Sequence, residues 1–159
     1  KMNCSNDEVF DKMSQLISNN KEKEKEITLL VKQNQEYVIN ELIDKSISYK
    51  EVKIIASKKN GIRDLKDFGS SICDKYSGNF IAVIGTIIKD KPMLVCVVSL
   101  KLQETLGANE IIMPLAKIID GGGGGKKSVS TAGGKDVSKL QEAIDKSILI
   151  IKEMIDERF

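Results

Sequence analysis

The residues best suited to chemistry lie in one stretch, Asp120 to Gly134, which reads DGGGGGKKSVSTAGG. Five successive glycines remove every Cβ from a run of backbone, so its N–H groups can face a partner and φ can become positive at little steric cost. Two lysines, Lys126 and Lys127, follow at once. The stretch therefore predicts a loop that approaches a phosphate closely, with a floor formed by Gly121, Gly122, Gly123, Gly124 and Gly125.

Two known nucleotide-binding motifs do not fit this stretch. A Walker loop requires a glycine where Asp120 stands, and a Ser or Thr that binds magnesium where Lys127 stands. The dinucleotide fingerprint would place its third glycine on Lys126, and it follows a strand, whereas a helical pattern precedes this run. We therefore exclude both motifs. A purely flexible linker stays open as an alternative.

Histidine is absent from all 159 residues of the sequence. This absence excludes Ser-His-Asp and Cys-His nucleophile systems, a two-histidine metal site and an imidazole base near neutral pH. Catalysis would have to use carboxylates, lysine or an imported metal. The sequence therefore predicts neither a catalytic residue nor a metal site.

Charged residues make up 30% of the chain but nearly cancel, to a net charge of +2. No global field would attract nucleic acid, so any such binding must come from local patches. The candidate patch combines Lys126 and Lys127 with Lys135, and a second cluster could extend it: Lys58, Lys59 and Arg63. Scattered surface lysines that only increase solubility are the alternative interpretation of that second cluster.

The sequence contains no run that approaches the ~18 apolar residues of a membrane span. Its three cysteines, Cys4, Cys73 and Cys96, are far apart, which predicts reduced thiols, with Cys73 and Cys96 in the core. We therefore expect a soluble, cytoplasmic protein without a membrane partner.

Residues 1–49 predict a helical hairpin or coiled-coil arm. We expect one helix over about 7–18, an interruption at Asn19-Asn20, and a longer helix over about 21–47. The longer helix carries a narrow apolar seam that includes Ile27, Val31 and Val38. An ordinary amphipathic helix packed on the domain is the alternative. Because the chain opens on Lys1 within this pattern, we expect it to be part of a longer protein.

Residues 50–159 predict a globular domain with a mixed sheet. Its expected elements are a strand over 52–56, a helix over 62–76, strands over 80–86 and 93–99, a helix that begins at Asn109 and crosses Pro114, the glycine loop, a strand over 129–132, and a last helix over 137–158 capped by Asp136. The fold class is α+β, a helical arm followed by a mixed-sheet α/β domain, with the boundary near residues 48–51.

From Val52 onward, the sequence resembles the DHHA1 domain, in particular the version at the carboxyl end of alanyl-tRNA synthetase. The resemblance rests on the strands FIAVIGT and KPMLVCVVS with their charged turn, the helix that leads into DGGGGG, and the AGG of Ala132–Gly134. Lys126 and Lys127 stand where that family typically has Arg-Pro, and lysine cannot reproduce the fork of an arginine. The helical arm is consistent with the coiled-coil segment that precedes the domain in the synthetase.

The resemblance implies a non-catalytic module of a class II synthetase that helps to bind the outer corner of tRNA, links aminoacylation to editing, and dimerises in some members. Its partners would be tRNA, the rest of the synthetase chain and, through the helical arm, a second copy. ATP and zinc would belong to other domains of the full-length enzyme. We expect the isolated chain neither to activate alanine nor to hydrolyse mischarged tRNA.

With tRNA as the partner, Lys126, Lys127 and Lys135 would neutralise phosphates, and the glycine backbone would approach the sugar-phosphate chain. Aromatic residues make up only 4% of the chain, so shape and charge rather than base stacking would dominate. Two alternatives stay open. One is the substrate-binding half of a DHH-family phosphoesterase, although such domains usually carry a histidine in the glycine motif. The other is a purely structural dimerisation module.

Overall fold

The computed structural model describes residues 6–62 and 64–159, which fall into two compact units. One unit ends at Asn40 and the other is Glu41–Phe159. The first consists of one continuous helix, α1 (Asn6–Asp44), whose last turn belongs to the second unit. The domain limits expected from the sequence, 1–49 and 50–159, stay a prediction about which segments fold independently.

The interruption predicted at Asn19-Asn20 is wrong, because both residues lie inside α1. Asparagine in a helix interior lowers helix stability by less than about 1 kcal/mol relative to alanine, whereas glycine and especially proline disrupt a helix more strongly. Neither glycine nor proline occurs in the helix, and the run after Asn20 is rich in the good helix formers Lys and Glu. The arm is therefore a single long helix and not a hairpin.

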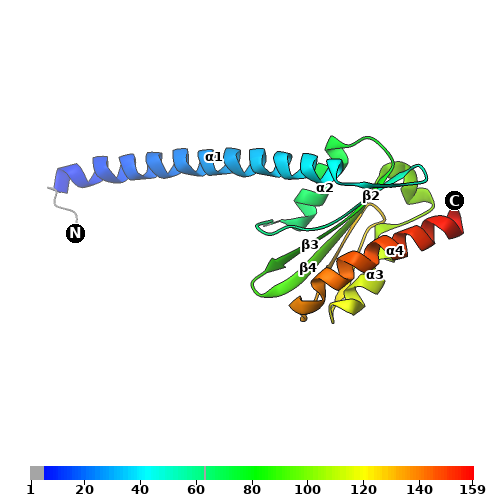
Figure 1. Ribbon diagram of the computed structural model, residues 1–159. Coiled ribbons are helices and arrows are strands. Elements are labelled where there is room, and N and C mark those ends of the chain that lie inside the picture. The colour runs from blue at the N-terminus through cyan, green and yellow to red at the C-terminus, as the bar shows by residue number, and fades with distance from the viewer. Residues whose placement is uncertain (1–5, 63) are drawn as a thin grey trace. The chain divides into compact units, whose positions relative to one another are not determined.

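The second unit is organised around a mixed sheet, which confirms the predicted fold class (Figure 1). Within the described residues the sheet has six strands, in the spatial order β1 (Ile47–Tyr49), β2 (Val52–Lys58), β3 (Phe80–Ile88), β4 (Lys91–Val98), β6 (Val129–Gly133) and β5 (Gly122–Gly125). Strands β2 and β3 are parallel, and every other neighbouring pair is antiparallel. The glycine tract therefore occupies one edge of the sheet.

Helices cover both faces of this sheet. Helix α2 (Leu65–Lys75) connects the parallel strands β2 and β3, and its Gly69 lies against Val95 and Val97 of β4. The opposite face carries α3 (Ala108–Ile118) and α4 (Leu140–Arg158), which share one apolar core with the alternate residues of β4. Two 3-10 segments, Leu100–Glu104 and Val137–Lys139, lead into these helices. Asp136 caps the second segment, through a hydrogen bond that its side chain accepts from the N–H of Ser138.

The centre of the sheet is the hairpin of β3 and β4. Residues Phe80–Thr86 and Leu94–Val98 are buried on both sides of the sheet, as their continuous apolar runs predicted. Lys89 and Asp90 form the turn between the strands, with φ values of 49° and 59°. Positive φ at both positions matches the twist of a two-residue hairpin turn.

Three local predictions differ from the structure. The glycine tract forms strand β5 instead of a loop, because β6 is bound by β4 on one side and offers its other edge to the glycine backbone. Helix α3 is capped at Gly107, and Asn109 lies within its first turn. Cys96 is buried as expected, whereas Cys73 is only half-buried on α2. The short strand β1, which pairs with β2, was not predicted.

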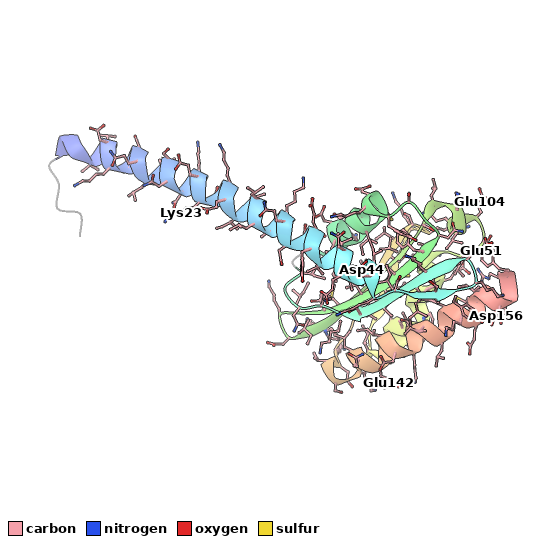
Figure 2. The ribbon with its side chains drawn as sticks, turned by 45° about the horizontal axis from the view of Figure 1, so that its top comes forward. Lys23, Asp44, Glu51, Glu104, Glu142 and Asp156 are labelled. Atoms are coloured by element: carbon pink, nitrogen blue, oxygen red, sulfur yellow. The ribbon has the colours of Figure 1, made fainter. Side chains whose placement is uncertain are left out.

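The carboxyl end of α4 ties several segments together. Asp156, labelled in Figure 2, accepts a hydrogen bond of 2.8 Å from the Tyr49 hydroxyl and pairs with Lys50 at 2.9 Å. Arg158 donates to the carbonyl of Thr105 and to Glu110, whose other oxygen accepts from the N–H of Gly107. Helix α4 therefore holds the start of α3 in place.

None of the helices in the described part of the chain is both long enough and apolar enough to cross a membrane.

Candidate nucleic-acid interface

Strand β5 lies at the edge of the sheet, and all four of its glycines are exposed. Two of these glycines are required by close packing within the fold. A Cβ on Gly123 would lie 2.6 Å from the Cβ of Ala132, and one on Gly125 would lie 2.7 Å from the carbonyl oxygen of Val129. Gly125 also has a φ of 152°. At these positions glycine permits β5 to approach β6.

The other two glycines of β5 have no such requirement. A Cβ on Gly122 or Gly124 would meet no atom within 4 Å, and neither residue has positive φ. Within the described residues, nothing in the fold therefore demands glycine at either position. Their effect is to leave a strip of exposed backbone without side chains, which an external group can approach closely.

The turn after β5 presents Lys126 and Lys127 on a fixed backbone. The N–H of Lys126 donates to the carbonyl of Val129 at 3.0 Å, and the carbonyl of Lys126 accepts from the Ser130 hydroxyl at 2.8 Å. The carbonyl of Lys127 accepts from the N–H of Ala108, at the start of α3. Both lysine side chains are exposed, and no ion pair within residues 6–62 and 64–159 involves them. Their charges are therefore available to an anion.

One carboxylate lies near this turn. The hydrogen bond from Arg158 lowers the pKa of Glu110, and the charge of Lys127 contributes a smaller part of the same effect. Because Arg158 and the N–H of Gly107 already bind Glu110, its negative charge is largely compensated. The turn keeps a positive character.

Lys135 lies at the other end of the glycine hairpin. The four residue pairs of β5 and β6 separate it from Lys126 and Lys127, a length of roughly 14 Å at the rise of an extended strand. There it borders a groove of about 550 Å³ together with Lys91, Met93, Asp120 and four glycines: Gly121, Gly122, Gly133 and Gly134. Lys91 was not predicted as a site residue, because only the pairing of β4 with β6 brings it to this groove.

The second predicted lysine cluster lies elsewhere. Lys58 ends β2, three strand spacings from β6, which is roughly 14 Å. The ammonium group of Lys59 lies 2.7 Å from Glu41, which also binds Lys45 at 2.7 Å. These two lysines hold the pKa of Glu41 down at about 2. The structure therefore does not bring Lys58 and Lys59 to the glycine strand, and Arg63 lies outside the described residues.

A second hollow, of about 620 Å³, lies beside the Lys126–Ser128 turn. Its walls include Ser128 and Val129, the end of α2 at Tyr76, and Lys101 after β4. The glycine hairpin thus has a hollow near each end, and each hollow has a lysine in its wall. Lysines and exposed backbone of this kind suit the binding of a phosphate-rich chain.

Comparison with known proteins identifies the family. The model of the DHHA1 domain matches residues 34–153, which is most of the chain. The chain belongs to the DHHA1 domain family. The match includes the whole glycine hairpin, the groove beside it and the central sheet.

The relatives of this DHHA1 domain include alanine–tRNA ligases. The enzyme of Dehalococcoides mccartyi is 36% identical over 107 residues, which is 65% of this chain and 12% of that protein. The enzyme of Natranaerobius thermophilus is 29% identical over 150 residues, which is 92% of this chain and 17% of that protein. The chain thus spans less than a fifth of the length of these relatives.

A solved structure has the same fold. The C-Ala domain from Aquifex aeolicus alanyl-tRNA synthetase superimposes with a TM-score of 0.59 over 69% of this chain and 96% of that domain, at 22% identity. The DHHA1 resemblance predicted from the glycine tract, the strand pair and the AGG ending is therefore confirmed.

Proposed function

We propose that this chain is the C-terminal tRNA-binding domain of an alanine–tRNA ligase, and that it assists aminoacylation and editing carried out by other parts of that enzyme. Its similarity to alanine–tRNA ligases, over 92% of its length in the Natranaerobius thermophilus enzyme, supports this role. ATP and zinc would bind to other domains of the ligase. The domain would act in the cytoplasm, where it would meet tRNA.

The observation that carries the proposal is the pair of glycines at 122 and 124. Both face open space, so an alanine would fit at either position without disturbing the fold. Glycine at both positions lets a partner outside the domain come closer to the backbone than a methyl group would allow. A sugar-phosphate chain lying along β5 is such a partner.

The charges near this strip favour RNA as that partner. Lys126 and Lys127 lie at one end of the hairpin, and Lys91 and Lys135 lie at the other. A phosphate chain that follows β5 would therefore meet positive charge at both ends. The small number of aromatic side chains also agrees with recognition through shape and backbone rather than through stacked bases.

The test is the salt dependence of tRNA binding. Replacement of Lys126 and Lys127 by alanine should weaken binding of an alanine tRNA transcript, and should reduce the slope of log K against log salt by about one to two, since each lost phosphate contact releases about one fewer counterion. The matched control is Lys66→Ala with Lys146→Ala, which removes the same charge from helices α2 and α4.

The control pair should leave the slope nearly unchanged, and replacement of Lys126 and Lys127 by glutamate should weaken binding further. An unchanged slope and affinity in the double alanine variant would remove the turn from the RNA interface. A wild-type chain that does not bind tRNA at all would overturn the proposed function itself.

We further propose that α1 forms a coiled coil with a second copy of the chain. An interrupted heptad series runs along the helix, in which Phe10, Ile17 and Val31 occupy one core position and Met13 and Ile27 the other. These five side chains are exposed on the helix. Asn20, Glu24 and Asn34 interrupt the series, and polar residues at such positions select register at some cost in stability.

Sedimentation velocity over a range of concentrations tests this pairing. The whole chain should form a dimer, and Ile17→Asp with Val31→Asp should shift it towards the monomer. The control Lys23→Asp with Lys32→Asp places the same acidic residues outside the heptad core positions. A concentration-independent monomer for the unaltered chain would contradict the proposal.

A further inference from the structure

Asp120 stands at a backbone position where glycine is the usual residue. It follows helix α3, where its N–H donates to the carbonyl of Lys117 and the next N–H, of Gly121, donates to Ala116. These two bonds define a Schellman ending, in which the residue at Asp120 must be left-handed, and its φ is 55°. Glycine is the usual residue at this position because it has no Cβ, and asparagine is sometimes found there.

The charge of Asp120 is equally unfavourable for the helix. The carboxyl end of a helix carries partial negative charge, so an aspartate there is repelled, whereas a lysine or a neutral residue is not. Within the described part of the chain, no ion pair compensates this carboxylate. The fold therefore gives no reason for aspartate at this position, and residues of this kind commonly mark a functional site.

The surroundings of Asp120 indicate a ligand. Asp120 borders the groove of about 550 Å³ that Lys91 and Lys135 also line, together with glycines that include Gly122. Two ammonium groups suit the phosphates of a nucleic acid. A carboxylate in the same groove would repel a phosphate, so its role must concern a different part of the same ligand, a hydrogen-bond donor that lies between phosphates.

We propose that Asp120 accepts a hydrogen bond from a ribose 2′-hydroxyl of the bound RNA, while Lys91 and Lys135 bind the phosphates on either side. The 2′-hydroxyl is the donor that lies along an RNA backbone and is missing from DNA, so this contact would make the groove selective for RNA. The inference rests on the proposed tRNA binding, and it adds that the groove recognises the 2′-hydroxyl, a group that other polyanions such as DNA lack.

The sign of one effect separates this role from simple repulsion. If Asp120 only repels phosphates, its removal should tighten the binding of RNA and DNA alike. If it accepts from a 2′-hydroxyl, its removal should weaken the binding of RNA and should leave DNA binding unchanged or slightly tighter. The variant Asp120→Gly suits this test, because glycine takes positive φ without strain.

The probes are an alanine tRNA transcript and the same sequence made with 2′-deoxyribose, each titrated with the whole chain by fluorescence anisotropy. The dissociation constant of the deoxyribose probe divided by that of the tRNA transcript should fall by about tenfold in Asp120→Gly. This is the effect expected for the loss of one hydrogen bond to a charged group. Asp120→Asn should give an intermediate ratio, because its amide oxygen is a neutral and weaker acceptor.

The matched control is Asp90→Gly. Asp90 also has positive φ, at 59°, and precedes Lys91, but it does not border the groove. Its removal should leave the ratio unchanged. An unchanged ratio in Asp120→Gly, with wild-type tRNA binding intact, would overturn this inference alone, whereas a wild-type chain that binds neither probe would overturn the proposed function with it.

Discussion

The two neighbouring hairpins of this sheet, β3–β4 and β5–β6, differ in burial and therefore in what they contribute to the protein. In the β3–β4 hairpin most side chains are buried, and Ile84 and Leu94 are completely inaccessible. In the β5–β6 hairpin, which adjoins it through β4, the outer strand has no side chains and is exposed. Stability is thus concentrated in the central hairpin. The edge hairpin contributes less to stability, so its exposed surface can be suited to contact with a partner.

The same contrast holds for the glycines within β5 itself. Gly123 permits the backbone of β5 to pack on Ala132, as an internal position would, whereas Gly124 faces open space. A strand of alternating faces therefore uses one residue type for two purposes, close packing on one face and access on the other.

The largest expected effect is in the central hairpin. Ile84→Ala should lower the free energy of unfolding by about 2–5 kcal/mol, because it leaves a cavity in a fully buried site. Thr131→Ala in β6 should cost less than about 1 kcal/mol, since Thr131 is only half-buried. Urea denaturation measures both values, and equal costs would contradict the division of roles between the hairpins.

A smaller effect should distinguish two adjacent glycines. Gly123→Ala should lower the free energy of unfolding by about 1–3 kcal/mol, because its new methyl group would clash with Ala132 and with the carbonyl of Thr131. Gly124→Ala should change it by less than about 0.5 kcal/mol. The pair is compared by thermal or urea denaturation, and a large cost at Gly124 would show that both glycines serve packing.

Gly124→Ala should nevertheless weaken tRNA binding. A methyl group on the exposed strip would hold a sugar-phosphate chain away from the backbone, and we expect a loss of about three- to tenfold in affinity, roughly 0.7–1.4 kcal/mol. Fluorescence anisotropy with a labelled tRNA measures this loss. Full affinity in this variant would separate the glycine strip from RNA binding, even if the lysines contribute.

Asp120→Asn should make the domain more stable. It removes a negative charge from the carboxyl end of α3 and keeps a residue that tolerates positive φ, so the free energy of unfolding should rise by about 0.3–1 kcal/mol. Asp90→Asn is the control, because Asp90 shares the positive φ but does not follow a helix. A loss of stability in Asp120→Asn would mean that the carboxylate makes a stabilising contact within the fold.

The smallest effect concerns Glu41, which binds Lys45 and Lys59 away from the glycine strand. Lys45 and Lys59 lower the pKa of Glu41 from its ordinary value of 4.5 to about 2. The ionised carboxylate therefore stabilises the folded chain at every pH above 4.5. This contribution should disappear as the pH falls from 4.5 towards about 2. Glu41→Gln should therefore be less stable than the unaltered chain at neutral pH and equally stable in acid, as measured by urea midpoints. A difference that persists in acid would indicate a role other than charge.

Much of the fold can be predicted from the sequence because its signals are local. The strands at β2, β3 and β4 are apolar runs, α2 and α4 carry apolar residues at helical spacing, and the parallel crossover follows from their order. The sequence also identifies Lys126, Lys127 and the glycines by residue type and adjacency. It does not predict α1 as one helix, because the two asparagines resemble an interruption that the surrounding helix formers overcome.

Tertiary structure decided what these residues can do together. Glycines have no preference for a strand, so β5 exists because β6 offers it an unpaired edge. Lys91 and Lys135 are distant in the chain and meet only because β4 pairs with β6, with Asp120 held beside them by the end of α3. Lys59 resembles Lys126 in the sequence, yet its charge is bound by Glu41, because ion pairs depend on distances in space and not on spacing along the chain.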